Sequence, residues 1–131
     1  MKTEVVTDQP MVALTFDDGP SPYTSQILDI LNQHDVKATF FFLGQQLEHY
    51  PEAAAETMAQ GSIVAWHSYS HSNLPGKPRW EQEQEILSWS TILDTTDYQA
   101  NLFRPPYGNY DQTTKEILEE KGYQVDEEGF K

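Results

Sequence analysis

Short apolar runs alternate along the chain with stretches whose apolar residues recur at helical spacing. The runs predict strands at 11–16, 36–43, 62–66 and 101–103, and a fifth could begin at 123–125. The stretches between them predict helices after Ser21-Pro22, and over 51–60, 80–98 and 112–121. Strands that are apolar without alternation are typical of a parallel sheet covered by helices. The pattern therefore predicts an α/β fold of about four to five parallel strand–helix units.

The length of the chain fits one domain. The 131 residues suffice for one hydrophobic core but not comfortably for two. Residues 1–10 lack a periodic pattern and are expected to form a flexible N-terminal arm. Residues 11–131 are expected to form the domain, without a linker or an internal repeat.

Composition excludes several classes of partner and chemistry. With 21 acidic residues against 8 basic ones, the net charge of −13 argues against nucleic acid and anionic membranes as partners. The absence of cysteine excludes disulfides, thiolate metal ligands and a cysteine nucleophile. No apolar run approaches the roughly 18 residues of a membrane span, and the first ten residues contain no signal-peptide core.

Charged and polar side chains directly follow three of the predicted strands. Asp17 and Asp18 come after the first strand, His67 after the third and Arg104 after the fourth. The carboxyl ends of parallel strands lie at the same edge of a sheet, where open α/β folds bind their ligands. These side chains are therefore expected to meet in a single site. The alternative for the two aspartates alone is a solvated strand-to-loop junction.

Two histidines, His67 and His71, are spaced at positions i and i+4. This spacing can bring both rings to one side of a helical turn or tight loop. Two imidazoles and a carboxylate, from Asp17 or Asp18, suit zinc or another divalent ion of the later first row. Two surface histidines without a metal are the alternative interpretation.

Arg104 opens a proline-rich loop that ends at Gly108. Two prolines restrict the backbone, so the arginine and a neighbouring N–H group would point in fixed directions. The guanidinium could pair with a carboxylate and keep it ionised. The alternative is an ordinary turn with an exposed arginine.

Three motifs together resemble a known family. TFDDGP, HSYSH and RPPYG occur at 15–20, 67–71 and 104–108. In this order they resemble the first three motifs of the NodB-homology polysaccharide deacetylases, carbohydrate esterase family four. The resemblance covers roughly residues 11–125. It implies a partial, distorted (β/α) barrel of parallel strands.

The resemblance also implies a role for each motif residue. The implied ligands of a divalent metal ion, most often Zn²⁺ with Co²⁺ or another first-row ion as alternatives, are Asp18, His67 and His71. Asp17 would be the general base that acts on a metal-bound water. Arg104 would orient Asp17 and tune its pKa, and the backbone N–H of Tyr107 would help to bind the oxyanion.

The implied activity is hydrolysis of acetyl groups from an N-acetylglucosamine polysaccharide, either peptidoglycan or a chitin-like glycan. An O-deacetylase of xylan stays open. Members of the family act on cell-wall and extracellular glycans, so an extracellular or cell-envelope location is expected.

The later family motifs do not occur before Lys131. They include an Asp/Trp stretch and a Leu-His pair whose histidine acts as general acid. The chain is therefore expected to be truncated after the third motif. The second hypothesis is a catalytically impaired relative that binds metal, and glycan as well, without turnover.

A third hypothesis is phosphoryl transfer to an aspartate after the first strand. Such enzymes usually separate their two acids by one residue, whereas Asp17 and Asp18 are adjacent. This hypothesis would also leave His67 and His71 without a role, so it is disfavoured.

Two further expectations concern surfaces. A parallel sheet without its last strands has an open edge, so the expectation is self-association through that edge, association with a separately encoded remainder, or marginal stability. Tyr69, Trp80 and Tyr107 lie near the motifs and could stack on sugar rings, although aromatic residues next to buried strands are more often part of the core.

Overall fold

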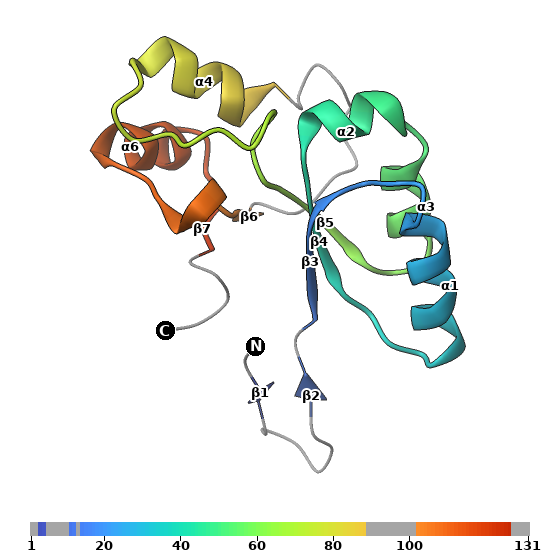
Figure 1. Ribbon diagram of the computed structural model, residues 1–131. Helices are drawn as coiled ribbons and strands as arrows, with labels where there is room; N and C mark the ends of the chain where they lie inside the picture. The colour runs from blue at the N-terminus through green and yellow to red at the C-terminus, as the bar shows by residue number, and fades with distance from the viewer. Residues whose placement is uncertain (1–2, 5–10, 13, 89–101, 127–131) are drawn as a thin grey trace.

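The computed structural model describes residues 3–4, 11–12, 14–88 and 102–126 of the chain. Its main element is a five-stranded sheet in which every neighbouring pair of strands is parallel (Figure 1). The strands follow the order of the chain: β3 (Thr15–Gly19), β4 (Thr39–Phe42), β5 (Ile63–Trp66), β6 (Leu102–Phe103) and β7 (Gln124–Val125). The expected α/β architecture of parallel strands is confirmed.

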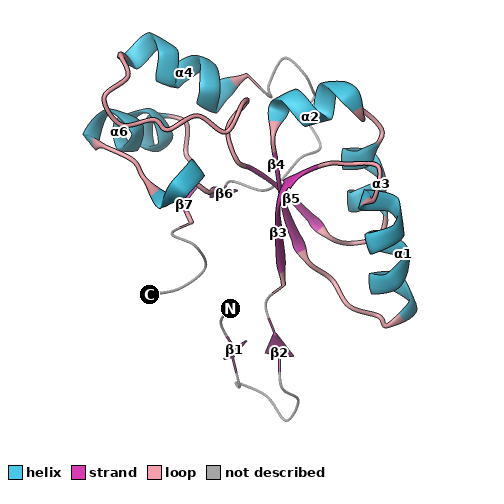
Figure 2. Ribbon diagram, in the orientation of Figure 1, coloured by secondary structure: helices cyan, strands magenta, loops and turns pink. Residues whose placement is uncertain are grey.

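Helices connect the strands and form two groups (Figure 2). The described helical segments are α1 (Thr24–Gln33), α2 (Gly44–His49), α3 (Ala53–Ala59), α4 (Arg79–Leu87), the 3₁₀ turn η2 (Pro106–Gly108) and α6 (Gln112–Glu120). Helices α1 and α3 contact each other on one side of strands β3 to β5, whereas α4 packs on α6 next to β7.

The three phenylalanines of β4 separate the core from the site. Phe40 and Phe42 belong to the main hydrophobic cluster, together with Trp66 and Phe103. Phe41 is also only 1% exposed but lies outside that cluster. Successive side chains of a strand point to opposite faces of the sheet. Phe40 and Phe42 therefore pack into the core, whereas Phe41 lies on the opposite face of β4.

The first strand differs from the prediction. Met11–Val12 forms β2 and pairs antiparallel with β1, Thr3–Glu4, in a separate two-stranded sheet. The parallel strand β3 begins only at Thr15. The single strand expected over 11–16 is therefore wrong, because a continuous apolar run does not indicate where a chain changes its pairing partner. Part of the expected arm is thus a strand, while the domain boundary at residue 11 stays a prediction.

Helix α2 was missed by the periodicity, which left 44–50 as a loop. Its six residues are too few to show a helical repeat. Tertiary contacts stabilise its start: the backbone N–H groups of Gly44 and Gln45 donate to the carbonyls of Ser68 and Tyr69, at 3.0 and 2.9 Å. These bonds satisfy N–H groups that a helix leaves unpaired at its first turn.

Other boundaries shift by a few residues. Helix α1 begins at Thr24 rather than at Pro22, and the Ser21 hydroxyl accepts a bond from the Tyr23 N–H at 3.1 Å. The helix expected over 80–98 is described only for Arg79–Leu87. Its expected apolar residues Trp89, Ile92 and Leu93 lie outside the described residues.

A polar network joins α4 to the start of α6. Asp111 caps α6 as expected, accepting bonds from the Thr114 N–H at 3.1 Å and, through its second oxygen, from the Gly76 N–H at 3.1 Å. The fully buried Gln82 donates to Asp111 and to the Lys77 carbonyl, and it accepts from the Thr114 hydroxyl. The backbone bond from Gly76, followed by the other donors, lowers the pKa of Asp111 to about 2.

The stability contributed by Asp111 should depend on pH. Its pKa is about 2 in the folded protein against 3.8 for the unperturbed group, so its contribution is present above about pH 4 and is lost as the pH falls through 2. We expect Asp111→Ala to lower the unfolding free energy by about 1–2 kcal/mol at neutral pH. Chemical denaturation from pH 7 to pH 2 would measure the difference, and a difference that is constant across this range would contradict the expectation. The exposed Asp29→Ala in α1 is the control.

Candidate active site

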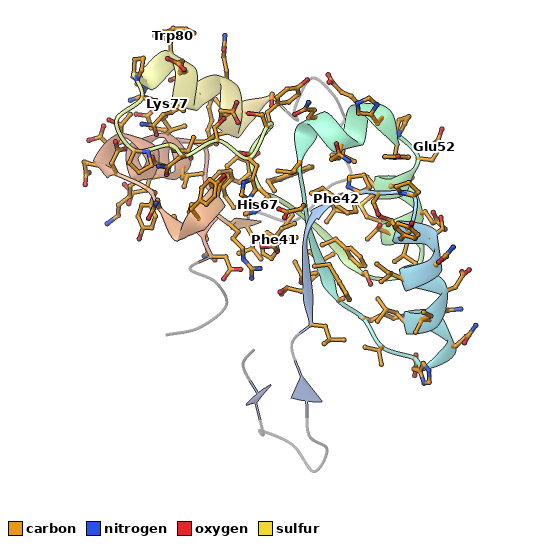
Figure 3. All side chains as sticks on the ribbon, viewed as in Figure 1. Phe41, Phe42, Glu52, His67, Lys77 and Trp80 are labelled. Atoms are coloured by element: carbon orange, nitrogen blue, oxygen red, sulfur yellow. The ribbon has the colours of Figure 1, made fainter. Side chains whose placement is uncertain are left out.

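The functional side chains lie at the carboxyl edge of the sheet. Asp17 and Asp18 lie near the end of strand β3. His67 follows β5, Arg104 follows β6 and Asp126 follows β7. Figure 3 shows His67 at the centre of the molecule, beside Phe41 and Phe42 of β4. The expected meeting of the first three motifs at one edge therefore occurs.

A bulge allows both adjacent carboxylates to reach His67. Asp17 pairs with Phe41 of β4 but Gly19 pairs with Phe42, so Asp18 is the extra residue of the bulge. Asp18 has a φ of 74°, which reverses the normal alternation of side chains. Its Oδ1 lies 3.3 Å from His67 Nε2, and Asp17 Oδ2 lies 3.8 Å from the same nitrogen.

Asp18, His67 and His71 form a cluster with the composition of a metal site. Asp18 Oδ1 is 3.3 Å from His67 Nε2 and 3.5 Å from His71 Nε2, and the three donor atoms lie within 4.8 Å of one another. Two ligands that are each about 2.1 Å from a tetrahedral zinc ion are about 3.4 Å apart. The donor types and their separations thus fit a divalent ion such as Zn²⁺.

The His67 ring is held by the backbone of the arginine motif. The Nδ1–H of this buried residue donates to the Arg104 carbonyl at 2.6 Å. This bond leaves Nε2 as the lone-pair nitrogen that faces Asp18, as is usual for histidine ligands. The following loop brings His71 to the same place, with Ser68 Oγ accepting a bond from the His71 N–H at 3.0 Å.

Arg104 connects two carboxylates beneath the cluster. It is 4% exposed, so the alternative of an exposed arginine in an ordinary turn is wrong. Its Nη1 donates to Asp17 Oδ1 at 2.7 Å, and its Nε and Nη2 donate to Asp126 Oδ2 at 3.1 and 2.7 Å. The guanidinium carbon lies 4.1 Å from the centre of the Phe41 ring. These contacts orient the Asp17 carboxylate, and they supply hydrogen-bond acceptors and negative charge to the buried Arg104 guanidinium.

Asp126 is a site residue that the sequence analysis missed. The sequence from residue 126 onward is polar and does not resemble a core strand, yet Asp126 makes two bonds to Arg104 and is only 20% exposed. A signal was present, because Asp126 directly follows a short strand, as do His67 and Arg104. The strand is only two residues long, and this weakened the pattern.

Tyr107 lies at the rim of the cluster. It is 66% exposed, and its ring meets the His71 ring edge-on at 4.7 Å between centroids. Its φ of 61° is unusual for a residue with a side chain and is fixed inside the short turn η2. The role expected for its backbone N–H stays a prediction.

The comparisons with known proteins agree with this geometry. A family model described as polysaccharide deacetylase matches residues 4–125. A peptidoglycan-N-acetylglucosamine deacetylase from Bacillus cereus is 40% identical over 121 residues, covering 91% of this chain and 42% of the relative. The chain belongs to the polysaccharide deacetylase family.

Two solved structures share the fold. The peptidoglycan deacetylase PdaC from Bacillus subtilis has a TM-score of 0.81 at 36% identity, covering 91% of this chain and 58% of that one. A family 4 carbohydrate esterase from Streptomyces lividans has a TM-score of 0.80 at 33% identity, covering 87% and 60%. The expected partial barrel is confirmed. The chain spans about two fifths of the length of the Bacillus cereus relative and about three fifths of the two solved chains.

Removal of either histidine should abolish tight metal binding. Loss of a group that hydrogen-bonds a metal ligand typically costs about 10–100-fold in affinity, and loss of a ligand itself should cost at least as much. We expect His67→Ala and His71→Ala each to weaken zinc binding by this amount or more, measured by dialysis against a competing chelator. The control is His34→Ala, which removes an exposed histidine. Parent-like affinity in both ligand variants would exclude the site.

Loss of Asp126 should destabilise the protein without removing zinc. Asp126→Ala leaves the buried Arg104 without two charge-assisted bonds, which should cost about 1.5–3 kcal/mol of unfolding free energy. Glu120→Ala is the matched control, because Glu120 pairs with the exposed Arg79 and should cost at most about 1 kcal/mol. Equal losses in both variants, measured by urea denaturation, would mean that the buried pair has no special importance.

Proposed function

We propose that the chain carries the active site of a metal-dependent hydrolase that removes acetyl groups from a polysaccharide containing N-acetylglucosamine. Peptidoglycan and chitin-like glycans are the proposed substrates. The observation that carries this proposal is the position of Asp17, which is bound to Arg104 and adjacent to the Asp18–His67–His71 cluster.

A divalent ion at the cluster would polarise the acetamide carbonyl and lower the pKa of a water molecule toward about 7. Zinc suits the two imidazoles and one carboxylate best, while Co²⁺ or another first-row ion would also fit. The hydrogen bond from His67 Nδ1–H to the Arg104 carbonyl supports His67 Nε2 as a ligand of this ion, because it leaves the lone pair of Nε2 available.

Asp17 is the proposed general base. Its side chain is 29% exposed, so one carboxylate oxygen can be bound by Arg104 while the carboxylate also faces the metal cluster. Arg104 fixes the orientation of the carboxylate, so Asp17 can take the proton of the attacking water without reorganisation. Attack on the acetyl carbon then produces a negatively charged oxygen.

The backbone N–H of Tyr107 is proposed to stabilise that oxygen. A donor of this kind contributes about 2.7–4 kcal/mol to the transition state in other enzymes. The rigid turn η2 and the contact of the Tyr107 ring with His71 keep this backbone at the rim of the cluster.

The leaving amine needs a proton from a general acid. Among the described residues the remaining histidines, His34 and His49, are exposed and do not belong to the cluster. This observation supports the second candidate function, a relative that binds metal and glycan without turnover. The two candidates make opposite predictions for acetate release.

The proposed location is the extracellular space or the cell envelope, where peptidoglycan and chitin-like polymers occur. In the described part of the chain, no helix is both long and apolar enough to span a membrane. The net charge of −13 supports a neutral or cationic polymer rather than nucleic acid as partner.

Acetate release from N-acetylglucosamine oligomers by the zinc-loaded protein tests the proposal. We expect Asp17→Asn to reduce the rate by about 10²–10⁴-fold, because the general base is removed. Zinc binding should persist, since the three ligands are unchanged. Asp29→Asn is the control on a distant exposed acid. If the parent binds zinc stoichiometrically but releases no acetate, the chain by itself is the relative without turnover.

A further inference from the structure

A cavity lies beside the loop between His67 and His71. It has a volume of about 900 Å³ and is bounded by α4, by α2 and by the loop between the two histidines. The side chains that matter for its chemistry are Tyr69, Ser70, Trp80, Glu83, Glu85 and Leu87. None of them has a role in the site described above.

One face of α4 forms the long wall of this cavity. Trp80, Glu83, Gln84 and Leu87 are spaced three or four residues apart and therefore lie on the same side of the helix. Gln82 and Ile86 are fully buried and belong to the other side. The wall extends for about 10 Å from Trp80 to Leu87, a length comparable with a disaccharide.

Trp80 is the dominant apolar group of the wall. Trp80 is 60% exposed, so part of the indole is accessible to a ligand in the cavity. Figure 3 shows Trp80 pointing outward from the start of α4, away from the sheet. An exposed aromatic face can stack on a sugar ring and can also attract a cation.

The charged groups that line the cavity are acidic. Glu85 accepts bonds from the Ser70 N–H at 2.9 Å and from the Ser70 hydroxyl at 2.8 Å, both neutral donors that leave its charge in place. Glu83 also lines the cavity and pairs with the exposed Arg79. Neither lysine nor arginine is among the described lining residues. The cavity thus suits a cation better than an anion.

The cavity and the metal cluster share one loop. His67 and His71 contribute to the cluster, whereas Tyr69 and Ser70 between them face the cavity. The backbone N–H of Gln45 holds the Tyr69 carbonyl at 2.9 Å, which fixes this wall. The cavity and the cluster are therefore adjacent along this loop.

We propose that this cavity is an accessory subsite for a sugar unit with a free, protonated amine, namely an already deacetylated glucosamine unit of the same polymer. This inference rests on the proposed deacetylase function. The indole of Trp80 would contact the sugar ring and its ammonium group, and the carboxylates of Glu83 and Glu85 would attract the charge. An acetylated unit would have the ring contact but no charge. Partly deacetylated chains would consequently bind better than fully acetylated ones.

Binding to the Asp17→Asn protein, loaded with zinc, separates the subsite from turnover. Glucosamine oligomers and N-acetylglucosamine oligomers of equal length are compared by calorimetry, at low salt and at high salt. We expect the glucosamine oligomer to bind more tightly, and we expect salt to reduce the difference because exposed charges are screened. Trp80→Ala should weaken its binding about two- to fivefold, and Glu83→Gln should reduce the preference for the amine.

The matched controls are Glu81→Gln and Trp80→Phe. Glu81 is on the same helix and pairs with Lys77, but it does not line the cavity, so its loss should leave the preference unchanged. Phenylalanine should restore part of the binding that alanine loses. Equal affinity for the two oligomers, or an amine preference that persists in both Trp80→Ala and Glu83→Gln, would overturn the proposal. Acetate release by the parent protein is measured separately, so failure of the deacetylase function would be seen independently.

Discussion

The buried guanidinium of Arg104 is the interaction on which the site depends. A cation that is 4% exposed is tolerated only when its donors are satisfied, and here Asp17 and Asp126 supply the charges while Phe41 covers one face. The carbonyl of the same residue holds the ring of His67. One residue therefore fixes the proposed base, the ring of His67 and the ends of three strands. Replacement of this arginine would disturb all of them together.

The site also stores backbone strain. Asp18, Ser68, His71 and Tyr107 all have φ between 61° and 74°, in the left-handed region that residues with side chains rarely occupy. Such strain persists only where the surrounding structure is rigid. Here the rigidity comes from the mostly buried strands β4 and β5 and from the polar network around Gln82. The stable part of the fold thus supports a site whose local conformations are unfavourable by themselves.

The errors of the sequence analysis have physical causes. The order of strands and helices was correct because parallel strands buried on both faces produce apolar runs without alternation. The first strand was misplaced because its apolar run spans two sheets, and α2 was missed because its start is stabilised by backbone bonds to Ser68 and Tyr69. Asp126 was missed because a strand of two residues barely changes the local pattern.

The sequence by itself determined the class of fold, the edge of the sheet that carries the chemistry and the residue types gathered there. Strand and helix periods and three short motifs are local, so they can be recognised without coordinates. Tertiary structure decided which aspartate faces which histidine, because the bulge at Asp18 depends on pairing with β4. It also decided that the Arg104 guanidinium binds both Asp17 and Asp126. The exposure of Trp80 at the cavity beside the loop between His67 and His71 likewise depends on packing. These relations join residues far apart in the chain, and only packing brings them into contact.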